Sequence, residues 1–101
     1  MAVFLYDFEW DPLKAHANFR KHGLDFERAA MVFQDPLAIT IPDEEHSLHE
    51  TRWVTLGKDA ADRYVTVVHT FEPLKGDRAR IRLISARRPT KAEIRDYEDQ
   101  Q

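Results

Sequence analysis

The hydrophobic pattern of this chain changes period once, close to the Asp35-Pro36 pair. Before this pair, apolar residues recur at helical spacing in two short stretches that are separated by Gly23. After it, apolar and polar residues alternate in four successive runs, as they do in strands. A chain of 101 residues in this order is expected to form one domain, residues 1–101, with helices packed on a sheet.

Cap signals predict where the helices begin and end. The Asp11-Pro12 pair indicates the start of a first helix, and Gly23 indicates its end through a left-handed C-cap. Asp25 begins a second short helix, which the Asp35-Pro36 pair ends. The sequence of residues 90–93, Thr-Lys-Ala-Glu, has the form of a capping box and indicates a C-terminal helix.

The remaining segments are expected to be strands. A first strand precedes the helices, and four further strands form an antiparallel meander after them; the expected ranges are 2–9, 37–41, 52–56, 63–71 and 79–87. Polar loops at 42–45, 58–62 and 72–77 separate the strands of the meander. The predicted fold class is therefore α+β: an antiparallel sheet of about four to five strands with two N-terminal helices and one C-terminal helix.

Composition excludes several classes of protein. The chain has no Cys, which rules out a disulfide scaffold, a thiol nucleophile and Cys-ligated metal. No run approaches eighteen apolar residues, so no membrane contact is expected. The N-terminus also lacks the basic start and apolar core of a signal peptide, so the cytoplasm is the expected location.

The net charge of −3 hides an uneven distribution along the chain. Residues 1–50 hold four Lys or Arg and ten Asp or Glu, whereas residues 51–101 hold eleven bases and eight acids. The segment 75–95 alone holds eight bases against two acids. This asymmetry favours an anionic partner on the last strands, although well-solvated arginines on a strand are the alternative explanation.

The motifs give little support for a metal site or for a serine nucleophile. His46 and His49 with Glu50 do not have the His-Glu-x-x-His zinc spacing, and on the strand-like run expected there the two histidines would point in opposite directions. Neither Ser47 nor Ser85 lies in a Gly-x-Ser-x-Gly elbow, and three glycines are too few for a phosphate-binding loop. No metal or cofactor is expected, and a hydrolase that uses His46 and His49 remains a minor alternative.

The remaining His, Arg, Lys and Glu residues suit the cleavage of RNA without a metal. A base would take the proton of a ribose 2′-hydroxyl, an acid would protonate the departing 5′-oxygen, and guanidinium groups would stabilise the charge on phosphorus oxygens. The candidates for proton transfer are His22, His46 and Glu50, and the candidates for phosphate contact are Lys21, Arg52, Arg82 and Arg87. Structural explanations stay open, because His22 could interact with a helix C-terminus and Glu50 could pair with Arg52.

Taken together and in order, the motifs of the chain resemble those of the BrnT toxin family. They are Phe8-Glu9-Trp10-Asp11, Lys14, Asn18, Lys21-His22-Gly23, Phe26-Glu27, Val32-Phe33, Asp35-Pro36, His46-Ser47, Glu50, Arg52, Ile84-Ser85-Ala86-Arg87, Glu93 and Tyr97-Glu98. They span nearly the whole chain. Each motif is weak alone, and it is the ordered set that carries the resemblance.

The resemblance implies a ribonuclease toxin of a type II toxin–antitoxin pair, with a RelE-like fold that has helices on one side of the sheet. It implies a BrnA-like antitoxin with a ribbon-helix-helix part, a complex of two toxins with two antitoxins, and operator DNA binding mainly through the antitoxin. The catalytic residues it favours are His46, Glu50, Arg52 and Arg87. The residues expected to bind RNA are Lys21, His22, Arg80, Arg82 and Arg88. A non-catalytic module that binds the antitoxin and acts only in repression is the alternative.

Overall fold

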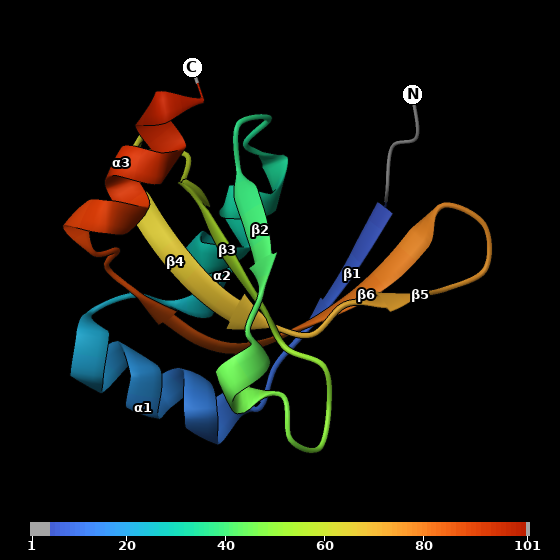
Figure 1. The fold of residues 1–101 in the computed structure, drawn as a ribbon. Helices are drawn as coiled ribbons and strands as arrows, with labels where there is room; N and C mark the ends of the chain where they lie inside the picture. Colours follow the sequence, from blue (N-terminus) through green and yellow to red (C-terminus); the bar gives the residue numbers. More distant parts are fainter. Residues whose placement is uncertain (1–4, 101) are drawn as a thin grey trace.

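The computed structural model describes residues 5–100 and forms one mixed sheet with three α-helices (Figure 1). Its strands are β1 (Leu5–Glu9), β2 (Ile39–Pro42), β3 (Trp53–Lys58), β4 (Tyr64–His69), β5 (Glu72–Pro73) and β6 (Arg78–Arg87). Its helices are α1 (Pro12–His22), α2 (Phe26–Ala30) and α3 (Lys91–Asp99), with short 3₁₀ turns η1 (Met31–Gln34) and η2 (Glu44–His46). Residues 2–4 of the expected first strand lie outside the described residues.

All three helices start at the residues that the cap signals predicted. The Asp11 side chain accepts a hydrogen bond from the backbone N–H of Leu13, and the Asp25 side chain accepts one from Arg28. Gly23 closes α1 with φ +70°, a left-handed conformation that glycine adopts without steric cost. Thr90 and Glu93 form both bonds of the capping box. These local predictions are confirmed because a cap depends only on residues a few positions apart.

The sheet has the order β1-β6-β4-β3-β2, and β5 also pairs with β6. Strands β2, β3, β4 and β6 form the expected antiparallel meander. The α+β class is confirmed, but β1 lies parallel to β6, so the sheet is mixed and not purely antiparallel. β5 forms inside the segment 72–77, which was expected to be a loop. The strand-like run expected around His46 is wrong, because that residue ends the 3₁₀ turn η2.

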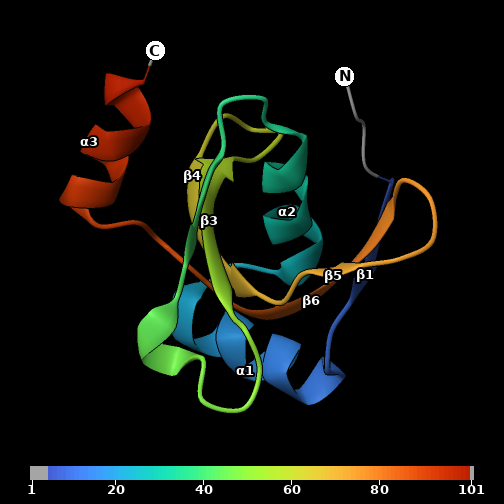
Figure 2. The same ribbon diagram turned by 45° about the vertical axis from the view of Figure 1, so that its right-hand side comes forward.

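The hydrophobic core lies on one face of the sheet, which we call the inner face. α2 and η1 cover it with Phe26, Ala29 and Val32, which pack against β4 and β6 (Figure 2). The inward residues of these strands are Val65, Val67, Ile81, Leu83 and Ala86. Burial of each large apolar side chain contributes roughly 1.5–3 kcal/mol to the stability of such a core.

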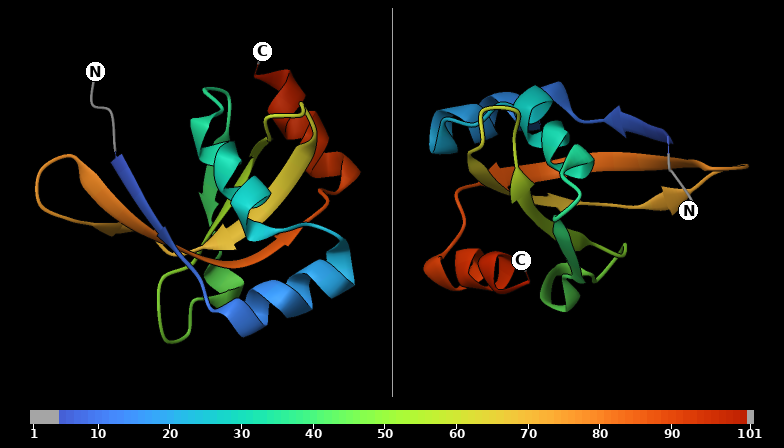
Figure 3. Two further views of the ribbon diagram at one scale, coloured as in Figure 1. Left: turned by 180° about the vertical axis from the view of Figure 1, so that it is seen from behind. Right: turned by 90° about the horizontal axis from the view of Figure 1, so that it is seen from above.

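α3 lies on the opposite face, the outer face, and contacts β3 (Figure 3). This differs from the expectation that all helices lie on one side. Alternation along the strands places Arg82 and Arg87 on the outer face, because their neighbours Ile81 and Ala86 point into the core. The register of β4 against β6 shifts between Val68 and His69, so the inward positions of β6 change from Ile81 and Leu83 to Ala86, and Arg87 lies on the same face as Arg82.

Candidate active site on the outer face

Glu50 joins two guanidinium groups at one end of the outer face. Its carboxylate accepts a hydrogen bond from Nη2 of Arg82, and its second oxygen lies 3.6 Å from Nη2 of Arg52. The bond from Arg82 is the main reason why the pKa of Glu50 lies below its ordinary value, with a smaller contribution from the charge of Arg52. Glu50 is therefore ionised near neutral pH and orients both arginines. The ion pair between Glu50 and Arg52 that the sequence left open is present.

His46 lies beside this pair and is held by Asp43. Nδ1 of His46 is 3.1 and 3.2 Å from the two carboxylate oxygens of Asp43. The backbone N–H of Asp43 donates to Arg52 O, which fixes the loop to the start of β3. With Nδ1 turned to Asp43, Nε2 is the nitrogen that can exchange a proton with a substrate, and the side chain is 63% exposed. Sequence reasoning missed Asp43, because it stood in a polar loop without a motif.

Arg87 lies on the same face and forms a two-bond pair with Glu93 of α3. Its Nη1 and Nη2 donate to the two carboxylate oxygens of Glu93 at 2.8 and 3.1 Å. The hydrogen bond from Glu93 is the main reason why the pKa of Arg87 is raised, and the charge of Asp43 adds to it. Burial would raise the pKa of Glu93, but the bonds from Arg87 outweigh it and lower the pKa. Asp43 is therefore close enough to Arg87 for its negative charge to stabilise the charged guanidinium group.

Of the four predicted catalytic residues, three line a common pocket of about 270 Å³. These three are His46, Glu50 and Arg52. Glu50 and Arg82 also line a neighbouring pocket of about 370 Å³. Arg87 lines neither of these two pockets, and the charge of Asp43 acts on it. The arrangement places one exposed imidazole, one carboxylate and three guanidinium groups around the outer face, which are the groups that phosphodiester cleavage needs.

The predicted RNA-binding residues divide into two groups. Lys21 and His22 lie in the last turn of α1, which Asn18 ties to β6 through two hydrogen bonds with the backbone of Ala86. Arg88 follows β6 directly and is exposed. These three residues therefore flank the C-terminal end of β6.

The arginines in the first half of β6 are paired with carboxylates. Arg80 donates to Glu72 at 2.7 Å and lies 3.8 Å from Glu9, while Arg82 donates to Glu50. Arg78 contacts Asp7 in the same way at 2.6 Å. The basic stretch that the sequence shows is thus largely neutralised on β6 by acids from other elements.

No metal centre is formed among residues 5–100: no group of three or more His, Asp or Glu side chains is placed to hold an ion. His46 and His49 line the same pocket, and His46 is engaged with Asp43. Within the same range, no helix is long and apolar enough to cross a membrane.

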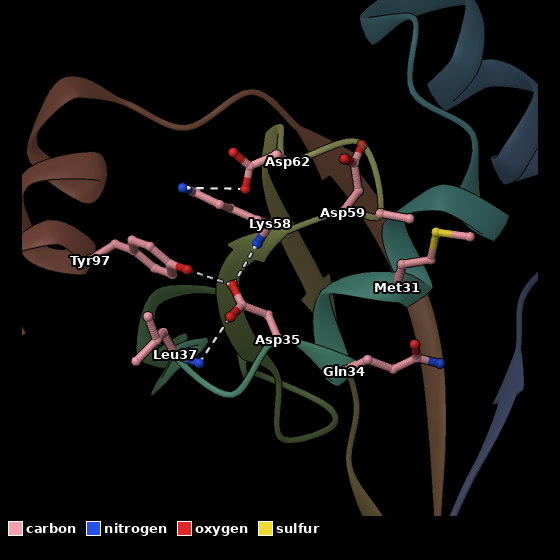
Figure 4. Close-up of a pocket in the computed structure, with 9 residues that line it drawn as sticks. Met31, Gln34, Asp35, Leu37, Lys58, Asp59, Asp62 and Tyr97 are labelled. Atoms are coloured by element: carbon pink, nitrogen blue, oxygen red, sulfur yellow. Dashed lines mark hydrogen bonds and ion pairs between the residues drawn. The ribbon is translucent and has the colours of Figure 1, made fainter. Parts of the chain in front are cut away.

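A second polar pocket, of about 410 Å³, lies between α3 and the η1 turn (Figure 4). Asp35 is its centre: one oxygen accepts from the hydroxyl of Tyr97 at 2.7 Å and from the backbone N–H of Lys58, and the other accepts from Leu37. Burial and this bond to Asp35 raise the pKa of Tyr97. Asp35, which the sequence assigned only to ending a helix, therefore also holds α3 against the sheet.

Comparison with known proteins places this geometry in a family. The family model described as "Ribonuclease toxin, BrnT, of type II toxin-antitoxin system" matches residues 10–93. No curated protein matches the chain. Among solved structures, the ribonuclease toxin BrnT of Brucella abortus is similar in fold: it is 24% identical, covers 83% of this chain and 96% of its own, and has a TM-score of 0.58. The matched range contains Asn18, His46, Glu50, Arg52 and Arg87. The chain therefore belongs to the BrnT family of ribonuclease toxins of type II toxin–antitoxin systems.

Proposed function

We propose that this protein cleaves RNA by general acid–base chemistry on the outer face without a metal ion, and that an antitoxin neutralises it. The observation that carries the proposal is the His46–Asp43 pair beside the Glu50–Arg52 pair, with the charge of Asp43 also acting on Arg87. The supporting context is that the family is one of ribonuclease toxins.

In the proposed reaction, the ribose 2′-oxygen attacks the adjacent phosphorus and the bond from phosphorus to the 5′-oxygen breaks. One proton leaves the 2′-hydroxyl and another reaches the departing 5′-oxygen. His46 is the candidate for exchanging these protons, since Asp43 fixes its ring and its side chain is exposed. Glu50, whose pKa is lowered, serves first to orient Arg52 and Arg82. Arg52 and Arg87 stabilise the negative charge that builds on the phosphorus oxygens.

RNA is proposed to enter along the C-terminal end of β6, where Lys21, His22 and Arg88 stand. Arg80 and Arg82 contribute in a different way. Because carboxylates hold them, they contact phosphate only through their remaining N–H groups, so each adds less to RNA affinity than Lys21 does.

The proposed partner is a BrnA-like ribbon-helix-helix antitoxin in a complex of two toxins and two antitoxins, which would act in the cytoplasm and bind operator DNA mainly through the antitoxin. The type II family supports an antitoxin partner. The alternative is a non-catalytic module that serves only in repression. One observation favours it: Arg87 and Arg82 are both occupied by carboxylates of this chain.

Cleavage of a defined RNA by purified protein tests the proposal, with and without a chelator. Full-length protein is expected to cut RNA equally well in the chelator, and His46→Ala and Arg87→Ala are expected to lose most of the activity. The matched control is Arg63→Ala, since Arg63 pairs with Asp59 away from the outer-face site. Loss of cleavage in the chelator would contradict the metal-independent mechanism, and normal growth during expression without antitoxin would favour the non-catalytic module.

A further inference from the structure

An aromatic pocket of about 330 Å³ opens on the inner face, away from α3. Its walls come from four elements or segments far apart in the chain: Tyr6 of β1, Phe33 of η1, Trp53 of β3 and Phe71, which follows β4. These four side chains are half-buried, although aromatic residues of this size are usually placed in a core. The volume lies within the range of roughly 300–1,000 Å³ that is typical of small-ligand sites.

Ring contacts hold the walls in place. The ring of Phe33 lies 5.7 Å from that of Tyr6, and it meets the imidazole of His69 edge to face at 4.8 Å and 84°. Such contacts fix the orientation of the rings before any ligand arrives. A flat ring that enters the pocket therefore meets aromatic surfaces that are already formed.

A chain of hydrogen bonds supplies polar atoms to this aromatic pocket. Nδ1 of His69 donates to the backbone carbonyl of Thr70, so Nε2 of the neutral ring accepts from the hydroxyl of Thr55 at 2.6 Å. The hydroxyl of Thr40 lies 2.8 Å from that of Thr55 and lines the pocket. Burial lowers the pKa of His69 and keeps the ring neutral. The exposed Thr40 thus offers an acceptor oxygen to a ligand while its proton goes to Thr55.

Phe71 connects this pocket with the outer-face site. It lines the aromatic pocket and also the neighbouring pocket that contains Glu50 and Arg82. A ligand that consists of a flat ring joined to a phosphate could therefore place the ring against Phe33 and Trp53 and its phosphate near Arg82.

We propose that the aromatic pocket binds one unpaired nucleobase of the RNA substrate, next to the phosphate that Arg82 contacts. Each base has a face that can stack on aromatic rings, and protein–RNA recognition of single strands commonly uses this contact. The identification of the ligand as RNA rests on the proposed function. The pocket itself is tested by a measurement that needs no cleavage.

The two tryptophans of the chain provide that measurement. Trp53 lines the pocket, whereas Trp10 packs edge to face on Phe26 in the core. In the Trp10→Phe variant, titration with a short 2′-O-methyl oligonucleotide, which cannot be cut by attack of the 2′-oxygen, is expected to quench the emission of Trp53 with saturation. In the Trp53→Phe variant, the emission of Trp10 is expected to stay constant. Circular dichroism confirms that both variants are folded.

An oligonucleotide that lacks one nucleobase provides a second test of the pocket. An oligonucleotide with one abasic position is expected to bind about tenfold more weakly at the best position, as is typical of a lost stacking contact. Phe71→Leu is expected to weaken binding of the intact oligonucleotide by a similar factor and to leave binding of the abasic one unchanged. Phe19→Leu, at a half-exposed position of α1, is the matched control and is expected to bind both normally.

The outcomes separate this proposal from the proposed function. RNA cleavage without quenching, together with equal binding of abasic and intact oligonucleotides, overturns the base pocket and leaves the ribonuclease role standing. Saturable quenching of Trp53 without cleavage supports the pocket and overturns the catalytic role. Emission of Trp53 that responds to the antitoxin but not to the oligonucleotide assigns the pocket to a protein partner and overturns the proposal.

Discussion

The side chain of Asn18 completes the backbone hydrogen bonds of Ala86, which lies 68 positions later in the chain. Its amide nitrogen donates to Ala86 O at 3.0 Å, and its amide oxygen accepts from Ala86 N at 3.0 Å. β1 pairs with β6 only as far as Arg82, so this edge of β6 has no strand partner at Ala86 among the described residues. Asn18 takes the place of that strand and attaches α1, with Lys21 and His22, to the end of β6.

Asn18→Ala is therefore expected to lower the free energy of unfolding by about 3 kcal/mol, because it leaves a buried N–H and a buried carbonyl without partners. Denaturation by urea, followed by circular dichroism, measures the change. His16→Ala on the exposed side of the same helix is the control and is expected to change stability by less than about 0.5 kcal/mol. An equal effect of both variants would contradict the role given to Asn18.

Gly57 of β3 is expected to tolerate no side chain. A Cβ atom at this position would lie 3.1 Å from both Cβ and O of Val32 and 3.3 Å from Cβ of Ala38. Gly57→Ala should therefore destabilise the protein by about 1–3 kcal/mol through overpacking between β3 and η1. Thermal unfolding measures this, with Ala60→Ser at an exposed position as the control; an unchanged melting temperature would show that η1 can shift.

Asp35 is expected to make stability depend on acid pH. Burial would raise its pKa, but the hydrogen bonds from Tyr97 and from the backbone of Leu37 and Lys58 outweigh it and lower the pKa. A carboxylate with a lowered pKa in the folded state stabilises the protein above its unfolded pKa, and this stability is lost as pH falls through the folded pKa. Asp35→Asn is therefore expected to cost about 2 kcal/mol at pH 7 and to flatten the loss of stability below about pH 4.

Urea denaturation between pH 7 and pH 2 provides this measurement. Asp99→Asn, at an exposed position at the end of α3, is the control and is expected to keep the acid-dependent loss. If Asp35→Asn keeps the full acid-dependent loss as well, another carboxylate is responsible for it.

Asp43→Asn is expected to reduce kcat for RNA cleavage by about ten- to a hundredfold with little change in KM. The amide cannot stabilise the imidazolium of His46 as a carboxylate does, whereas removal of the imidazole itself should cost about 10²–10⁴-fold. Single-turnover cleavage compares the two variants directly. Glu44→Gln, an exposed neighbour in η2, is the control. A change confined to KM would place Asp43 in binding.

RNA affinity is expected to depend more on Lys21 than on the arginines of β6 that are held by carboxylates. Lys21→Gln should weaken binding and reduce the slope of log K against log salt by about 0.7, the value for one phosphate of a single strand. The double variant Arg80→Gln with Glu72→Gln removes an ion pair without a change in net charge and should bind within about twofold of the original protein. Fluorescence anisotropy at several salt concentrations measures both variants, and a larger loss in the double variant would show that Arg80 contributes as much to RNA affinity as Lys21.

The sequence by itself determined the local elements and the family. The caps at Asp11, Asp25 and Thr90 depend on residues within one turn, so they could be predicted and are confirmed. The alternation of apolar residues likewise predicted the meander and the outward direction of Arg82, because the side-chain period of a strand is fixed. The ordered motifs identified the BrnT family, which the family model confirms.

Only the tertiary structure decided which charges meet. The parallel pairing of β1 with β6, the placement of α3 on the outer face and the bond between Tyr97 and Asp35 join residues that are far apart in sequence. A stretch of eight bases favoured an anionic partner on the last strands, yet Glu72 of the adjacent strand β5 pairs with Arg80, and Glu50, 32 positions away, pairs with Arg82. Periodicity fixes the face on which a side chain lies, but the partner on that face depends on how strands and loops pack, and no local pattern carries this information.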